Sequence, residues 1–213
     1  MRMLLLALAL TTAAAPAFPE PPRSREQALA ALASGDAATR AEAVVWIANR
    51  GGAADDALLH ERLRDESAFV RSYAEQALWL LWSRSGEREI DALMARGVEQ
   101  MQAGRHAEAI AVFSRVISGK PDFAEAWNKR ATVYYLAGEH RKSLADCEEV
   151  LKRNPRHFGA LSGAGMVNIA LEQYEEAQRW FRRALEVNPN MVGVELELLR
   201  LEERLKDKRK RST

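Results

Sequence analysis

Apolar and small residues recur every 34 residues along the second half of the chain. Each repeat holds two apolar stretches with helical spacing and closes just after a proline, at Pro121, Pro155 and Pro189. The eighth and twentieth positions of every repeat are small, as two closely crossing helices require: Gly97, Ala109, Ala131, Ser143, Gly165 and Ala177. A repeat of this length predicts helix pairs that stack on one another, because a single pair cannot bury its own apolar face.

The same register divides this half of the chain into three units, 90–123, 124–157 and 158–191. An amphipathic stretch, 192–206, follows the last proline and carries apolar residues at Val194, Leu198, Leu201 and Leu205. We expect a capping helix here, whose apolar face covers the last unit while its other face stays polar. Residues 207–213 form a basic tail, which we expect to be frayed and solvated.

The three units resemble the tetratricopeptide repeat. Besides the small residues and the prolines, the resemblance rests on large or apolar residues at position 24, which are Phe113, Cys147 and Phe181. It implies an all-α fold, a right-handed α-α superhelical solenoid. Glycines fit the turn inside the first two units, at Gly104 and Gly138. Glu172 takes this place in the third unit and predicts a tighter or less left-handed turn.

In this family, the first helix of each unit lines a concave groove that accepts an extended peptide or a helix. Carrying groove positions 5, 9 and 12 onto the sequence gives Met94, Val98, Met101, Asn128, Thr132, Tyr135, Ser162, Met166 and Ile169. Three methionines favour an adaptable surface, since thioether chains repack around different apolar ligands. Some family members clamp a terminal carboxylate with lysines, arginines and asparagines, but Met94, Val98, Ser162 and Met166 cannot do this. Packing is an equal alternative for Met101 and Ile169, whereas binding is favoured for Asn128, Thr132 and Tyr135.

A different period, of 31 residues, governs residues 24–86. Thr39 and Arg40 recur as Val70 and Arg71, each followed by spaced alanines. This pattern resembles a pair of HEAT-like repeats, and it predicts two helix-turn-helix units. Asp36 and Asp65 are placed to cap the second helix of each unit, because a carboxylate oxygen can satisfy free backbone amides.

Two tryptophans, Trp79 and Trp82, share one face of the helix that leads into the tetratricopeptide units. The first alternative is that they pack a junction at which both repeat types form one continuous superhelix. The second is that they are an exposed aromatic anchor for a partner.

The first residues carry the signature of export. Residues 1–17 combine Arg2, a leucine- and alanine-rich run and the small-x-small site Ala15-Pro16-Ala17, which together indicate a signal peptide. A proline-rich linker, 18–23, follows. The apolar run is too short for a membrane helix, so no integral membrane segment is expected after cleavage. The run from Trp127 to Gly165 resembles small exported tetratricopeptide proteins of Gram-negative bacteria, which implies a periplasmic location.

Composition and motifs argue against nucleic-acid binding, catalysis and metal or cofactor binding. A net charge of +1 with 29% charged residues gives no basic stripe for nucleic acid. The sequence lacks nucleophile elbows, phosphate loops, and Cys-His or HExxH zinc patterns, so we expect no enzyme, no metal and no cofactor. The single Cys147 stands where the other units have Phe, which predicts a buried thiol. A reactive thiol or an intermolecular bridge is the less favoured alternative.

Three functions remain open. The first is a periplasmic interaction scaffold or adaptor that binds a peptide or helix of a protein partner. The second is a structural protein that self-assembles, with its HEAT-like end stacked on another copy's terminal helix. The third is a tether that holds an anionic envelope surface through Lys206 to Arg211.

Overall fold

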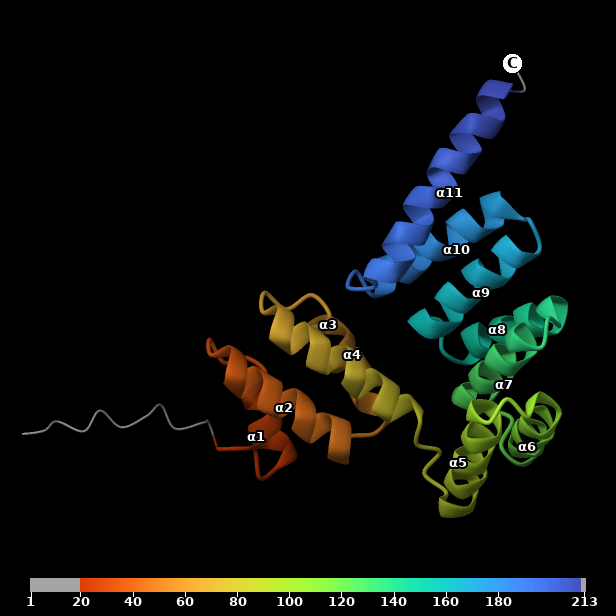
Figure 1. The fold of residues 1–213 in the computed structure, drawn as a ribbon. Coiled ribbons are helices and arrows are strands. Elements are labelled where there is room, and N and C mark those ends of the chain that lie inside the picture. The colour runs from red at the N-terminus through yellow and green to blue at the C-terminus, as the bar shows by residue number, and fades with distance from the viewer. Residues whose placement is uncertain (1–19, 212–213) are drawn as a thin grey trace, which may run out of the picture.

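The computed structural model describes residues 20–211, which form eleven α-helices and one short 3-10 helix and contain no strand (Figure 1). The all-α solenoid expected from the sequence is therefore confirmed. The predicted signal peptide and the beginning of the linker lie outside the described residues. Within residues 20–211, no helix has both the length and the apolar character that crossing a membrane requires.

Two helix pairs make up the N-terminal module, which we define as residues 24–86. Its elements are α1 (Arg25–Ala31), α2 (Ala37–Arg50), the 3-10 helix η1 (Ala53–Asp55), α3 (Asp56–Arg62) and α4 (Ala68–Trp82). α1 packs on α2, α3 on α4, and α2 on α4. Val44, Ile47, Leu59, Val70 and Leu78 are fully buried between them, so the module has a core of its own.

The helix caps of the module were predicted only in part. Asp36 caps α2 as expected, since its carboxylate accepts the N–H of Thr39 at 2.8 Å. Asp65 does not cap α4, whose N-cap is Ser67. Ser67 stands 31 residues after Asp36, so the 31-residue period alone would have predicted this N-cap. The prediction of Asp65 came from the preference for Asp at N-caps and was wrong. Asp65 instead accepts the N–H of Ser67 at 2.9 Å.

Three antiparallel helix pairs and a final helix form the tetratricopeptide region. The pairs are α5 (Arg88–Gln102) with α6 (His106–Gly119), α7 (Ala124–Leu136) with α8 (His140–Arg153), and α9 (Phe158–Ala170) with α10 (Tyr174–Val187); α11 (Val192–Arg211) follows. Each helix packs on the next, and the inner helices α5, α7 and α9 also pack in sequence. Phe113 and Phe181 are fully buried between the helices of their units.

The turn of the third unit corrects an expectation. Glu172 has a φ of 60°, close to the 70° of Gly104 and the 77° of Gly138. The turn is therefore as left-handed as in the other units. Packing of α9 on α10 imposes this conformation although a side chain disfavours it.

Helix α11 covers the last repeat as predicted, with Leu201 and Leu205 buried and Val194 and Leu198 packed beside Phe181. Two expectations about this helix were wrong. Its helical conformation continues through Arg211, so residues 207–211 are not a frayed tail. Its outer face is not wholly polar either, because Val192, Leu196 and Leu199 are at least half exposed.

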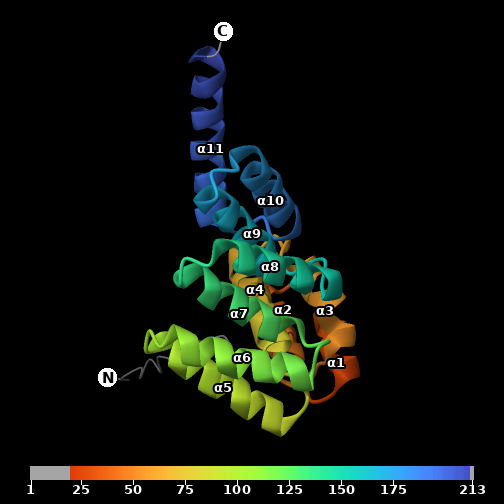
Figure 2. The same ribbon diagram turned by 90° about the vertical axis from the view of Figure 1, so that its right-hand side faces the viewer.

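The N-terminal module does not extend the superhelix. Helix α4 ends at Trp82, residues 83–87 turn the chain, and α5 starts in a new direction. Figures 1 and 2 show that the module lies beside the tetratricopeptide region, on the side of α5, α7 and α9. Trp79 and Trp82 do pack a junction, but against His157 and Phe158, where the second unit meets the third. The expected continuous superhelix is thus replaced by a chain that doubles back.

Candidate functional site

Most of the nine groove candidates are engaged by the chain itself. Met94 is buried, and Val98 and Met101 pack against the same cluster around Phe113. Asn128 is buried, and Ile169 packs beside Phe181 and Leu201 under α11. Half-buried Ser162 donates its hydroxyl to the carbonyl of Gly159 at 3.1 Å.

The remaining candidates form an accessible surface on α7 and α9. Thr132 is exposed, Met166 is 36% exposed, and Tyr135 is half buried with its ring 5.5 Å from that of His140. Leu136, which the chosen positions 5, 9 and 12 did not include, is 53% exposed next to Tyr135. We call Thr132, Tyr135, Leu136 and Met166 the α7–α9 face. Leu136 and Met166 are its apolar members, and Thr132 and Tyr135 each carry a hydroxyl group.

A buried polar cluster that sequence reasoning missed lies at the starts of α7 and α9. The Glu125 carboxylate accepts hydrogen bonds from Asn128 Nδ2 at 2.9 Å and from His157 Nε2 at 3.1 Å. Lys129 Nζ lies 3.0 Å from its second oxygen. His157 Nδ1 accepts the N–H of Ala160, so Nε2 is the ring nitrogen that donates to Glu125.

Glu125 stands at position 2 of its unit, which is a groove position in the family but was not carried over with positions 5, 9 and 12. Including position 2 among the groove positions would have identified Glu125 from the sequence. Burial alone would raise the pKa of the Glu125 carboxyl, but the hydrogen bond and charge interaction with His157, together with the charge of Lys129, outweigh it, and the pKa lies below its ordinary value. The carboxylate is thus charged, with one oxygen hydrogen-bonded by Asn128 and His157 and the other paired with Lys129, so it serves the fold.

The two tryptophans join the module to the boundary between the second and third units. The Trp82 ring stacks on the His157 ring at 4.3 Å, and its Nε1 donates to Asp56 at 2.8 Å. Trp79 meets Phe158 edge to face at 5.2 Å. Asp56 also binds Arg156 at 2.6 Å. This arrangement is a composite aromatic and ionic contact between segments far apart in the sequence.

Two arginines, Arg40 and Arg71, repeat one contact pattern, which we call the arginine ladder. Arg40 donates to the carbonyls of Ser34 and Gly35 in its own unit and reaches Asp65 at 2.7 Å in the next. Arg71 donates to the carbonyls of Asp65 and Glu66 and reaches Asn190 at 2.9 Å. The loop before α11 therefore sits where the turn of a third module unit would be.

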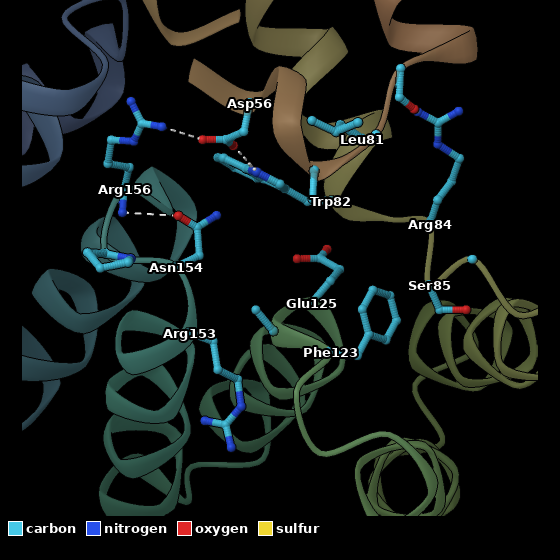
Figure 3. Close-up of a pocket in the computed structure, with 16 residues that line it drawn as sticks. Asp56, Leu81, Trp82, Arg84, Ser85, Phe123, Glu125, Arg153, Asn154 and Arg156 are labelled. Carbon is cyan, nitrogen blue, oxygen red and sulfur yellow. Dashed lines mark hydrogen bonds and ion pairs between the residues drawn. The ribbon is translucent and has the colours of Figure 1, made fainter. Parts of the chain in front are cut away.

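A cavity of about 730 Å³ opens where the end of α4 faces the start of α7 and the loop before α9 (Figure 3). Trp82 and Phe123 form apolar walls, and buried Glu125 lies at its floor. The guanidinium groups of Arg84 and Arg153 turn away from its centre, towards backbone carbonyls at Asn49 and Pro121. Both guanidinium groups at the cavity thus already have partners.

Cys147 is buried beside Ala131 and Ala164, as the sequence predicted. Burial, together with the neighbouring charges of Asp146 and Glu148, raises the pKa of its thiol to about 12. A thiol in this state is a poor nucleophile at neutral pH. The alternative of a reactive cysteine is therefore disfavoured.

Stacked antiparallel helix pairs with an apolar face on the inner helices define a class, the α-helical repeat proteins. Within it, models of the tetratricopeptide repeat match residues 94–149 and 122–190. Residues 94–190 of this chain are therefore tetratricopeptide repeats.

Two relatives place these repeats among known proteins. A TPR repeat-containing protein of Rhizobium etli is 35% identical over 135 residues, which are 61% of this chain and 66% of that protein. Tetratricopeptide repeat protein 12 of Homo sapiens is 30% identical over 101 residues, 47% of this chain and 14% of its own length. The chain thus spans just under two thirds of the first relative and a small part of the second.

Solved structures agree with the fold. The first tetratricopeptide domain of Spaghetti (RPAP3), bound to the HSP90 peptide SRMEEVD, is 25% identical with a TM-score of 0.54, covering 55% of this chain and 93% of that one. The Sgt2 tetratricopeptide domain from Aspergillus fumigatus has a TM-score of 0.56 at 21% identity, covering 58% of this chain and 83% of that one. The likeness of residues 24–86 to HEAT-like repeats stays a prediction.

Proposed function

We propose that the protein is a non-enzymatic periplasmic adaptor that binds a peptide or a helix of a partner protein on the α7–α9 face. The observation that carries the proposal is the exposure of Leu136 and Met166 on the inner helices of a tetratricopeptide fold. Contiguous exposed apolar side chains on such a surface favour association with another protein.

The chemistry of the face indicates what kind of segment it takes. The Spaghetti domain that resembles this region binds a peptide ending in acidic residues. Here groove positions 5 and 9 of the first and third units hold Met94, Val98, Ser162 and Met166. These groups do not attract a carboxylate, so we propose an apolar segment as the ligand.

Proximity labelling in the native periplasm tests this function. We expect Leu136→Asp combined with Met166→Asp to lose the labelled partners, because two charges would face the apolar segment. Thermal melting should stay near wild type, since both side chains are exposed. As a control, Leu196→Asp with Leu199→Asp introduces the same charges on the exposed side of α11 and should keep the partners. Unchanged labelling by the α7–α9 variant would contradict the proposal.

The periplasmic location rests on the sequence of residues 1–17. We expect N-terminal sequencing of the protein purified from cells to begin at Phe18, after the small-x-small site. Fractionation should recover it with periplasmic markers. An unprocessed protein in the cytoplasmic fraction would overturn this part of the proposal.

Self-association is a second candidate, favoured by the exposed side of α11. Val192, Leu196 and Leu199 are spaced four and three residues apart and lie on one helix face. A second copy that stacks its N-terminal module there would cover them. Light scattering over a dilution series tests this idea, and a monomer at every concentration would exclude it.

A further inference from the structure

We infer that the tetratricopeptide region carries a niche for an aromatic side chain, and that Trp79 fills it as a built-in ligand which occludes the concave side. The inference rests on the proposed function, because occlusion matters only for a chain that binds a partner on this side. Its test, however, measures the module alone and needs no partner.

The niche is defined by the absence of a side chain at Gly159. A Cβ added at Gly159 would come within 2.3 Å of Trp79 Cη2, so the indole occupies the space that any other residue would fill. The walls are the rings of His157 and Phe158, at 5.5 Å and 5.2 Å and nearly perpendicular to the indole. Lys129 Nζ lies 5.8 Å from the ring centre, within cation-π range. The chemistry of the niche therefore suits an aromatic ring.

The position of the niche gives it a role in access. Gly159 is position 2 of the third unit, and Lys129 belongs to the inner helix α7 of the second. A segment that crosses the inner helices through this end of the groove would meet Trp79. The α7–α9 face, further along the same helices, is accessible. A partner that needs the full groove must therefore displace the module.

The module is built so that it can move as one body. Its core residues Val44, Ile47 and Leu78 are buried among its own helices, and only Phe158, Val187 and Met191 join that cluster from the repeats. Residues 83–87 are its covalent link to α5, and Gly86 there has a φ of 79°. Asp56–Arg156 and Arg71–Asn190 are among the polar contacts that undocking would break. Such a closed state lowers the apparent affinity of any ligand that requires the open one.

Two substitutions disrupt the contact between Trp79 and the niche, one in the module and one in the repeats. Trp79→Ala removes the ring and leaves the niche intact, whereas Gly159→Ala fills the niche and leaves the ring without space. Gly163→Ala is the matched control on the same helix, since its Cβ would meet Cys147 Sγ at an ordinary 3.5 Å. Labels at the exposed positions Ser72 and Ala145 report docking by pulsed electron spin resonance.

We expect a single narrow distribution of label distances in the wild type and in Gly163→Ala. In Trp79→Ala and Gly159→Ala, a second and broader population of distances should appear. Continued protection of the Cys147 thiol checks that the repeats stay folded in each variant. If both variants keep the label distances of the wild type, the module stays docked without the Trp79 contact and the inference is wrong.

A synthetic peptide with the sequence of residues 68–86 probes the niche directly. It should bind Trp79→Ala at least tenfold more tightly than the wild type, where the niche is already filled. Gly159→Ala, although undocked, should not bind it, and a peptide with alanine in place of its first tryptophan should bind neither variant. Equal binding of the peptide by the wild type and Trp79→Ala, or by Trp79→Ala and Gly159→Ala, would overturn the inference. Loss of partner labelling by the α7–α9 variant is a separate result, so the two proposals can fail independently.

Discussion

Glu125 occupies a position where inner helices of repeat proteins meet their ligands, yet its carboxylate is completely buried. His157, Asn128 and Lys129 supply the partners that a ligand would otherwise offer. A buried carboxylate with these partners stays charged, and removing one partner would leave it uncompensated. This residue therefore links the start of α7 to His157, the N-cap of α9, and so couples two neighbouring inner helices.

Stability should consequently depend on pH through Glu125. Its pKa is lowered in the folded state, so its contribution is fully present above the unfolded value of about 4.3 and is lost as the pH falls through the folded pKa. We expect Glu125→Gln to be about 2 kcal/mol less stable at pH 7 and to lose less stability than the wild type between pH 5 and 3. Thermal melts followed by circular dichroism measure both effects. Parallel pH profiles would contradict the assignment.

Glu172 offers a gain at a single residue. Its φ of 60° costs a side chain about 1 kcal/mol, and the other two units use glycine there. We expect Glu172→Gly to raise the free energy of unfolding by a few tenths to about 1 kcal/mol, the gain being limited by the flexibility of glycine in the unfolded chain. Urea unfolding measures it. The reverse change, Gly138→Glu, should lower the free energy by a similar amount, and a loss in Glu172→Gly would refute the reasoning.

Single positions could be predicted where the repeat register compares them across units. Cys147 was assigned to the interior because Phe113 and Phe181 share its position, and it is buried. The left-handed turn at Glu172 could not be predicted, since residue preference points away from it while helix packing enforces it. Binding was favoured for Asn128, but its side chain donates to Glu125 instead. Glu125 stands at position 2 of the unit, which was not among the positions carried onto the sequence.

Within each helix pair, one close contact sets the distance between the two helices. A Cβ at Gly97 would lie 2.5 Å from the Phe113 ring, and one at Gly165 would lie 2.3 Å from the Phe181 ring. The second unit combines Ala131 with the smaller Cys147 in one cluster. Small and large residues are thus exchanged together, which keeps the packed volume of the pair nearly constant.

This compensation predicts a measurable coupling. Gly165→Ala alone should destabilise the protein by about 1–3 kcal/mol through overpacking. With Phe181→Cys added, which reproduces the pairing of the second unit, the double variant should lose less than the sum of the two single changes. A double-mutant cycle in urea unfolding measures this difference, which we expect to exceed about 0.5 kcal/mol. Gly163→Ala is the control, and strict additivity would argue against the contact.

Helices and their pairing were accessible from the sequence because their signals are local. Repeat spacing, prolines and glycines gave all three tetratricopeptide pairs and both module pairs. The ends were less certain: α4 begins after Ser67 and α11 continues to Arg211. Charged residues at a terminus suit a solvated helix as well as a loose tail, so composition does not separate them.

The arrangement of the whole molecule depends on contacts that leave no periodic trace. Arg71 and Asn190 are 119 residues apart, and Asp56 and Arg156 are 100 apart. Sequence comparison of neighbouring repeats gives no information on such pairs, which is why a continuous superhelix was expected. The junction also explains the placement of both tryptophans, which the sequence left open between packing and exposure.

These long-range contacts should make unfolding cooperative. A linear stack of repeats can unfold in steps, but here the module bridges the second unit and the loop before α11. We expect tryptophan fluorescence and exposure of the Cys147 thiol to give coincident urea transitions. Arg71→Ala should lower the free energy of unfolding by about 1–3 kcal/mol, because it leaves Asn190 and two carbonyls without their donor. Both midpoints should therefore move together to lower urea concentration. Separate transitions in the wild type would show that the module and the repeats unfold independently.

The arginine ladder has a consequence for how such a chain can evolve. Repeat proteins usually change length by duplicating or losing a unit, since each contacts only its neighbours. Here Arg71 must reach Asn190 while Asp56 reaches Arg156 in the preceding loop. An additional helix pair between these loops would displace one of them by about 10 Å, the spacing of packed helices, and both contacts could not form. The two contacts of the module, at Arg156 and at Asn190, therefore fix the number of helix pairs between these loops.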